Sequence, residues 1–395
     1  MVERMVERGY DRDFAQRCFN QIKGFGEYGF PESHAASFAH LVYASSWIKC
    51  FHPDVFCAAL LNSQPMGFYA PAQIVRDARE HGVEVRPPCI NTSDWDCTLE
   101  PNGEGSFAVR LGLRVVDSLP ELSGRWIVAE RQGGYRDFDD FIRRADIGVK
   151  ALNALAKADA FHNLGLDRRQ GLWAAKKVAS LKPLPLFAAA GENRADPRVA
   201  LPRLMPSENV IDDYRSTRLS LRGHPLEFLR PIYARQGAIN CAALARARHG
   251  SWVTVAGVVL IRQRPGSGQV VFVTIEDETG VANVVVWPNM LERFRPVVMA
   301  ARVMVVQGTV ERLDKERSPR PIYSIDGERG PAVPIVHLVA HRLIDASGDL
   351  TRLSDQEALL PVAPADHVKR PLAGSWQTGR HPRNVRVVPR SRDFH

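Results

Sequence analysis

The run WVTVAGVVLI at Trp252–Ile261 begins the part of the sequence that decides the fold. It is rich in β-branched residues, and this composition returns in three further runs, at Val270–Ile275, Val281–Trp287 and Val303–Val310. The acidic turn Glu276–Gly280 between the second and third runs predicts a hairpin. A short helix is expected at Met290–Phe294 and a fifth strand near Val333–Val339. Five strands with a helix between the third and the fourth are the order of an OB-fold barrel.

The rest of the sequence has helical and linker character, so we expect a multi-domain α+β protein. Its 395 residues exceed the size of one hydrophobic core, which favours two or three domains. Pro53 predicts that two helices of the first part meet near Phe51–His52. The expected divisions are residues 1–85 (helical), 86–106 (connector), 107–180 (short helices), 181–239 (linker with a short helix at Glu208–Leu219), 240–345 (barrel) and 346–395 (basic tail).

Charge and composition exclude several classes of protein. The formal net charge of +8 favours a polyanionic partner, and the chain from Asp366 onward carries seven Lys and Arg residues against two acids. No apolar stretch approaches about 18 residues, and the first residues lack the apolar core of a secretory signal. We therefore expect a cytoplasmic protein without membrane contact, whose six cysteines are reduced and bind no structural metal.

The segment Gly24–Gly29 (GFGEYG) matches the G-x-G-x-x-G pattern of dinucleotide sites. We reject that interpretation because a helix precedes it, where the fingerprint requires a strand. A glycine-rich turn between two helices is expected instead, with the second helix beginning at His34 and Ser33 as its N-cap. A phosphate could rest at this helix start, close to Lys23. The simpler alternative is that His34 is an ordinary first-turn residue.

No motif for nucleophilic or metal-dependent catalysis is present in the sequence. The densest carboxylate groups are Asp137–Asp140 and Glu276–Glu278. We interpret the first as an exposed helix start and the second as a hairpin turn, so neither is expected to support two-metal chemistry. We therefore assign no catalytic residue and no metal ligand to this chain.

The expected barrel carries arginines and aromatics of the kind that bind single-stranded nucleic acid. Arginines contact phosphates, and aromatic rings stack on bases. The candidates are Arg262, Arg264, Phe272, Trp287 and Arg312. The alternative is that the aromatics belong to the barrel core, and for Trp287, which precedes a proline at a strand end, both interpretations stay open.

Three longer stretches carry a family resemblance. They read GFGEYGFPESHAASFA, SSWIKCFHPDVFCAALLNSQPMGFY and IVRDAREHGVEVRPPCINTSDWDC. Together they resemble the C-family bacterial DNA polymerases, the relatives of the polymerase III alpha subunit. The run Asn62–Tyr69 and the tail His381–His395 resemble the error-prone branch of that family. The resemblance extends, with gaps in the linker, over essentially the whole chain.

This resemblance implies a role for each segment. Residues 1–85 would be the end of the fingers domain, where Lys23, Ser33 and His34 approach the phosphates of a dNTP. Residues 107–180 would be a tandem helix-hairpin-helix region that holds duplex DNA behind the active site. Its first hairpin, Val116–Pro120, lacks the usual glycine and carries an aspartate, so the second unit is the expected phosphate contact. That unit contributes Lys150, Lys157, Gly165, Arg168 and Arg169. Residues 240–345 would contact single-stranded template.

The resemblance also implies a function that depends on other parts of a polymerase. The palm and its three metal-binding aspartates have no counterpart here, so Mg²⁺ and dNTP are expected only in the intact enzyme. This C-terminal part would bind DNA without polymerising it, within damage-induced, mutagenic (translesion) synthesis and DNA repair. A stand-alone, non-catalytic DNA-binding protein is the alternative, and a hydrolase has no supporting residues.

Two kinds of protein partner are also implied. Leu184–Phe187 (LPLF) is similar to the peptide that bacterial sliding clamps bind, but it lacks the leading glutamine. A degenerate clamp motif and a plain linker are both open for this segment. Accessory mutagenesis proteins are the other expected partners.

Overall fold

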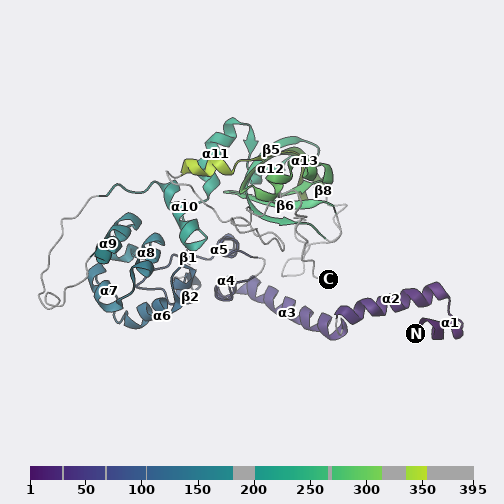
Figure 1. The fold of residues 1–395 in the computed structure, drawn as a ribbon, viewed down its shortest axis with the longest axis horizontal. Helices are drawn as coiled ribbons and strands as arrows, with labels where there is room; N and C mark the ends of the chain where they lie inside the picture. Colours follow the sequence, from purple (N-terminus) through teal and green to yellow (C-terminus); the bar gives the residue numbers. More distant parts are fainter. Residues whose placement is uncertain are drawn as a thin grey trace, which may run out of the picture.

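The structure is a computed structural model, and it describes residues 1–28, 31–66, 69–103, 105–180, 201–265, 269–313 and 335–353. Five helices form the first part: α1 (Val2–Glu7), α2 (Arg12–Tyr28), α3 (Pro31–Phe51), α4 (Pro53–Asn62) and α5 (Pro71–Glu80). The predicted meeting of two helices near Phe51–His52 is confirmed, because His52 is the N-cap of α4 and Pro53 its first residue. In Figure 1, α1, α2 and α3 form an arm that leads away from the other elements.

The start of α3 corrects the prediction for the glycine-rich segment. Helix α2 continues through Gly24 and Gly26 to Tyr28, and α3 already begins at Pro31. Proline is favoured in a first turn because its missing N–H would have no partner there. Ser33 therefore lies inside the first turn of α3 and is not its N-cap.

The connector expected at residues 86–106 and the residues next to it form a small three-stranded sheet. Strand β3 (Phe107–Arg110) pairs with β1 (Val85–Arg86) in parallel and with β2 (Thr98–Pro101) antiparallel. Val109 and Leu111 are buried against α4 and α5, together with Cys57 and Cys97. A short 3-10 turn, η1 (Leu113–Val115), follows this sheet.

The helices α6 (Glu121–Glu130), α7 (Phe138–Ala145), α8 (Val149–Lys157) and α9 (Arg168–Ser180) form one module. A 3-10 turn, η2 (His162–Leu164), lies between α8 and α9. Phe141 and Phe161 are fully buried, with ring centroids 5.3 Å apart, and Ile127 and Leu152 pack with them. Aromatic contacts of this kind hold the short helices together, since helices of this length are marginal alone.

Residues 206–239 are a packed part of the structure, which corrects the prediction of a linker. The predicted helix at Glu208–Leu219 is α10 (Pro206–Thr217), and a second helix, α11 (Pro225–Arg235), was not predicted. Their buried residues Ile211, Leu229 and Tyr233 form a core with the barrel strands. Residues 346–353 also differ from the expected tail, because η3 (Ser347–Leu353) buries Leu350 in the same core.

The barrel confirms the predicted OB-fold order. Its strands are β5 (Trp252–Gln263), β6 (Val271–Asp277), β7 (Gly280–Val286), β8 (Val303–Leu313) and β9 (Ile335–Asp345), with α13 (Pro288–Ala300) between β7 and β8. They follow the order β5-β6-β7-β9-β8, and pairing of β5 with β8 closes the barrel. A short strand β4 (Ala238–Ile239) and helix α12 (Cys241–Arg246) precede them. Inward residues such as Val273, Ile275 and Val284 fill the interior.

Candidate nucleic-acid interface

Two of the four charged side chains predicted on the second helix-hairpin-helix unit face solvent. Lys150 and Lys157 are exposed at opposite ends of α8. Arg169 is half-buried, donates to the carbonyl of Pro202 at 2.9 Å and lies 3.7 Å from Glu208. Of the four predicted cations, Lys150 and Lys157 are therefore the two that are accessible to a phosphate. Exposed cations of this kind contribute DNA binding that does not depend on sequence.

Arg168 corrects the prediction of a phosphate contact. Its side chain is 1% exposed and forms an ion pair with Asp213 of α10. It also donates to the carbonyl and to the side-chain oxygen of Asn209, at 3.0 and 3.1 Å. A buried charge needs such partners, because an unpaired one carries a large desolvation cost. Arg168 therefore joins α9 to α10 in the interior.

The first hairpin, Val116–Pro120, contacts the C-terminal end of α10. The backbone N–H of Asp117 donates to the carbonyl of Ser216 at 2.7 Å, and its carboxylate lies 3.1 Å from Arg218. Ser118 has a φ of 64°, the left-handed region that glycine adopts more easily. The N–H and the charge of Asp117 are therefore already paired, and the weakness of this hairpin as a DNA contact stays a prediction.

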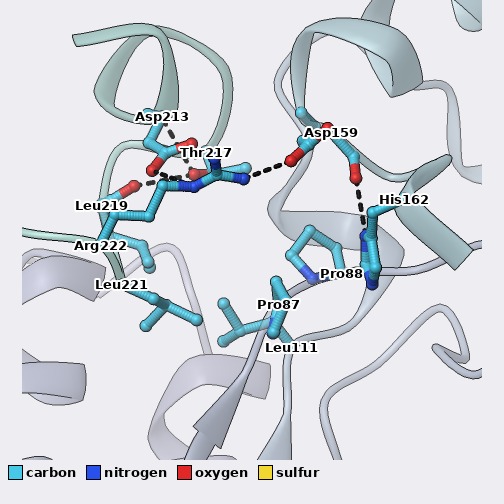
Figure 2. Close-up of a pocket in the computed structure, with 11 residues that line it drawn as sticks. Pro87, Pro88, Leu111, Asp159, His162, Asp213, Thr217, Leu219, Leu221 and Arg222 are labelled. Carbon is cyan, nitrogen blue, oxygen red and sulfur yellow. Dashed lines mark hydrogen bonds and ion pairs between the residues drawn. The ribbon is translucent and has the colours of Figure 1, made fainter. Parts of the chain in front are cut away.

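The second hairpin is held in the same way. Asp159, at a φ of 57°, lies in the turn after α8 and forms an ion pair with Arg222. Arg222 also lies 3.5 Å from Asp213, so it bridges the hairpin and α10 (Figure 2). These residues line a cavity of about 260 Å³ together with Pro87, Pro88, Leu111, Ala158, His162, Thr217, Leu219 and Leu221. Arg218 and Arg222 therefore form ion pairs with an aspartate of the first and of the second hairpin, respectively.

On the barrel, Arg262 also differs from the prediction. It is 1% exposed, and its guanidinium donates to the carbonyls of Val298 and Ala301 on α13. These bonds satisfy carbonyls at the C-terminal end of the helix, where a cation is favoured. Arg262 is thus an interior cap of α13 and does not face DNA.

Two other barrel arginines are partly accessible. Arg264 is half-buried just beyond the end of β5. Arg312 donates to the carbonyl of Ala245 at 3.2 Å, and its backbone N–H donates to His249 at 3.1 Å. Arg312 therefore links β8 by hydrogen bonds to the end of α12 and to the loop that follows it.

The predicted aromatics lie on the outer side of the barrel. Phe272 is opposite Val285 of β7, while its neighbours Val271 and Val273 point into the core. Trp287 is 49% exposed at the end of β7, so the alternative that it is a core residue is wrong. Sequence reasoning missed His337 of β9, whose ring centroid is 6.5 Å from that of Phe272. The rings of Phe272 and His337 thus lie near each other, and accessible flat rings are what base stacking requires.

The acidic turn Glu276–Glu278 connects the barrel to two helices. Glu276 forms an ion pair with Arg76 of α5, and burial raises the pKa of Glu276. Arg230 of α11 reaches both Asp277 at 2.8 Å and Glu278 at 2.6 Å. Burial disfavours the charge of Asp277, but hydrogen bonds from Thr279 and the Cys241 N–H lower its pKa below the usual value. The turn is therefore structural.

The three residues expected near a nucleotide belong to α2 and α3. Lys23 is exposed on the last turns of α2, and Ser33 and His34 belong to the first turn of α3. Helix α3 thus begins eight residues after Lys23 in the chain, and the phosphate site stays a prediction. The clamp-like segment Leu184–Phe187 and the basic residues beyond 353 lie outside the described residues.

The Mg²⁺ that the resemblance implies does not fit the donor groups of the described part of the chain. Among those residues, no three His, Cys, Asp or Glu side chains are grouped so as to hold a metal ion. The carboxylates of the acidic turn and of Asp140 are instead bonded to arginines. We therefore derive no catalytic step here. Within the same residues, no helix is long and apolar enough to cross a membrane.

Comparison with known proteins gives family matches for two parts of the chain. Residues 82–171 match a family described as a helix-hairpin-helix motif, and residues 253–325 match an OB-fold nucleic acid binding domain. The first match begins at residue 82, so the segment expected as a connector belongs to this motif. Both modules therefore agree with the fold described above.

Several full-length relatives are similar to the whole chain. It is 51% identical to an error-prone DNA polymerase of Brucella abortus, over all of this chain and 34% of that protein. It is 48% identical to error-prone DNA polymerase 2 of Rhizobium meliloti, over 98% of this chain and 35% of the relative. Among solved structures, asparaginyl-tRNA synthetase from Pyrococcus horikoshii is 24% identical over 28% of this chain and 23% of its own, with a TM-score of 0.20.

Proposed function

This chain belongs to the family of bacterial error-prone DNA polymerases and spans about a third of the length of its curated relatives, and we propose that it is the DNA-holding part of such a polymerase. The observation that carries the proposal is the presence of two nucleic-acid modules on one chain. Exposed Lys150 and Lys157 mark the first module, and the pair Phe272–His337 and the exposed Trp287 mark the second.

The two modules suit different forms of DNA. Point charges contact the phosphates of a duplex without reading its sequence, which suits Lys150 and Lys157. Aromatic rings need unstacked bases, which only a single strand offers. We infer that duplex product lies against the helix-hairpin-helix module and single-stranded template against the barrel.

Salt dependence tests the binding part of the proposal. If about four to six phosphates are neutralised, log K should fall with log salt at a slope of roughly −3 to −5. Binding of a duplex and of a single strand should be titrated at several salt concentrations with the chain as it exists. An affinity that does not change with salt would show that phosphates are not the ligand.

Polymerase activity is proposed only for the whole protein. Nucleotidyl transfer requires carboxylates that hold Mg²⁺, and we propose that they come from the other two thirds of the family's length. Lys23, Ser33 and His34 are proposed to lie near the dNTP phosphates in that assembly, because a helix start favours phosphate. Primer extension by this chain alone with Mg²⁺ and dNTPs is expected to be absent. Extension that depends on a carboxylate of residues 1–395 would contradict this.

The biological role proposed is damage-induced, mutagenic synthesis past lesions. The support is that its relatives are named error-prone DNA polymerases. A sliding clamp and accessory mutagenesis proteins are the proposed partners. Pull-down of the whole polymerase with the clamp, compared between the native segment Leu184–Phe187 and the same segment with both leucines changed to alanine, tests the first of these.

A further inference from the structure

We propose that the barrel has a second base-stacking site, formed by Trp252 and His341, on a surface strip that follows β9; the proposal rests on the single-strand binding proposed above. Trp252 begins β5 and is 60% exposed, and His341 is exposed on β9. Their ring centroids are 5.1 Å apart, with an angle of 36° between the planes.

A bulge in β9 brings His341 to this position. Gln307 of β8 pairs with Arg342, but the next residue, Gly308, pairs with Ala340, so His341 has no residue opposite it. Ala340 and Leu343 both point into the core, which leaves His341 and Arg342 together on the outer side. Such bulges re-aim side chains at functional sites.

The backbone and a hydrogen bond keep the pair in place. A Cβ added at Gly308 would lie 2.0 Å from the carbonyl oxygen of Val339, so only glycine allows the two strands to approach here. Thr309 is opposite Trp252 on β8, and its hydroxyl shares a hydrogen bond of 3.1 Å with Nε2 of His341. The imidazole is therefore oriented beside the indole before any ligand binds.

The two aromatic pairs of the barrel share one strand. His337 of β9 lies against Phe272, and His341 of the same strand lies against Trp252. Four residues of strand separate the two histidines, which is about 13 Å. This distance is well beyond the roughly 3.4 Å step between neighbouring stacked bases, so the two pairs suit bases that are not neighbours in the strand.

The charged side chains next to the two aromatic pairs indicate which class of ligand fits the surface along β9. Arg342 is exposed beside His341, and exposed Arg248 lies in the turn before Trp252, where Ser251 donates to its carbonyl. Glu311 is exposed opposite His337, so we place the phosphates on the side of Arg342 and Arg248. Aromatic faces next to arginines match a single-stranded nucleic acid, which carries bases and phosphates in alternation.

The test compares single-strand and duplex binding of the full chain. Fluorescence anisotropy with a labelled oligothymidylate of about 20 nucleotides covers the site size of one OB fold. Trp252→Ala should raise the Kd for this strand about 5- to 150-fold, the usual loss for one stacked base. Binding to a duplex of equal length should stay the same, because its base faces are covered. Trp252→Phe should lose less than Trp252→Ala.

Controls distinguish a loss of this site from a loss of folding and from the contribution of Trp287. Trp126→Ala, on α6 and 51% exposed, is the matched tryptophan substitution and should leave single-strand binding unchanged. The melting temperature of Trp252→Ala should stay within a few degrees of the parent, since the ring is mostly exposed. Wild-type affinity of Trp252→Ala, while Trp287→Ala is weakened, would overturn the second site and leave the proposed function standing. No single-strand binding by the parent chain would overturn both.

Discussion

Removing the guanidinium of Arg168 gives the clearest test of whether this residue is structural or binds DNA. In Arg168→Ala, two hydrogen bonds to Asn209 and the ion pair with Asp213 are lost. All three bonds involve the charged guanidinium, and hydrogen bonds to charged groups contribute about 1.5–3 kcal/mol each. Asp213, whose side chain is 12% exposed, keeps Ser220 at 2.8 Å and Arg222 at 3.5 Å, which reduces the loss. We expect a destabilisation of about 3–4 kcal/mol, within the range for breaking a buried pair.

Urea unfolding followed by tryptophan fluorescence measures this effect, since Trp126 and Trp173 belong to α6 and α9 of the same module. A salt titration of DNA affinity, under conditions where the variant is folded, is the companion measurement. Its slope should equal that of the parent. The control is Lys157→Ala, which should leave unfolding unchanged and reduce the slope by about 0.9, the value for one phosphate. If Arg168→Ala instead unfolds like the parent and loses about 0.9 of the slope, the structural interpretation is refuted.

Three further substitutions test other parts of the structure. Trp287→Ala should weaken single-strand binding by about 1–3 kcal/mol with an unchanged melting temperature, and a large loss of stability with normal binding would reverse this assignment. Arg230→Ala leaves Asp277 without its cation, so it should destabilise the chain by about 3 kcal/mol in urea unfolding, whereas a neutral effect would mean that the turn is independent of α11. A hydrogen bond from Arg143, together with the Arg136 N–H and Arg144, lowers the pKa of Asp140 from 3.8 to about 2. Its stabilisation is therefore complete above about pH 4 and is lost as the pH falls to about 2. Asp140→Asn should flatten acid unfolding in that window, and an unchanged acid profile would argue against the carboxylate's role.

Much of the barrel could be predicted because its signal is local. β-branched runs separated by turn residues determine strands over a few residues, and each strand begins within two residues of its predicted start. Helix α11 was missed because Pro231 lies inside it and the preceding segment is rich in proline. Tertiary packing of Leu229 and Tyr233 compensates for that unfavourable local sequence.

The candidate site was predicted less well than the fold. Lys150, Arg168 and Arg262 have similar chemistry in the sequence, yet the first is exposed and the other two are buried. The partner of Arg168 is 45 residues away in the chain, and the carbonyls that bind Arg262 are 36 and 39 residues away. Local pattern contains no information about such contacts. The aromatic pairs with His337 and His341 were missed for the same reason.

The sequence by itself determined the order of strands, the helical character of the first part and the family, because these depend on local periodicity and on long runs of residues. Only the tertiary structure decided which charges face solvent. Asp117 and Asp159 lie in the two hairpins, and Arg218 and Arg222, which follow α10 in the chain, form ion pairs with them. Whether a side chain is free to bind a ligand depends on every group that folding brings within a few ångströms, and those groups come from distant parts of the chain.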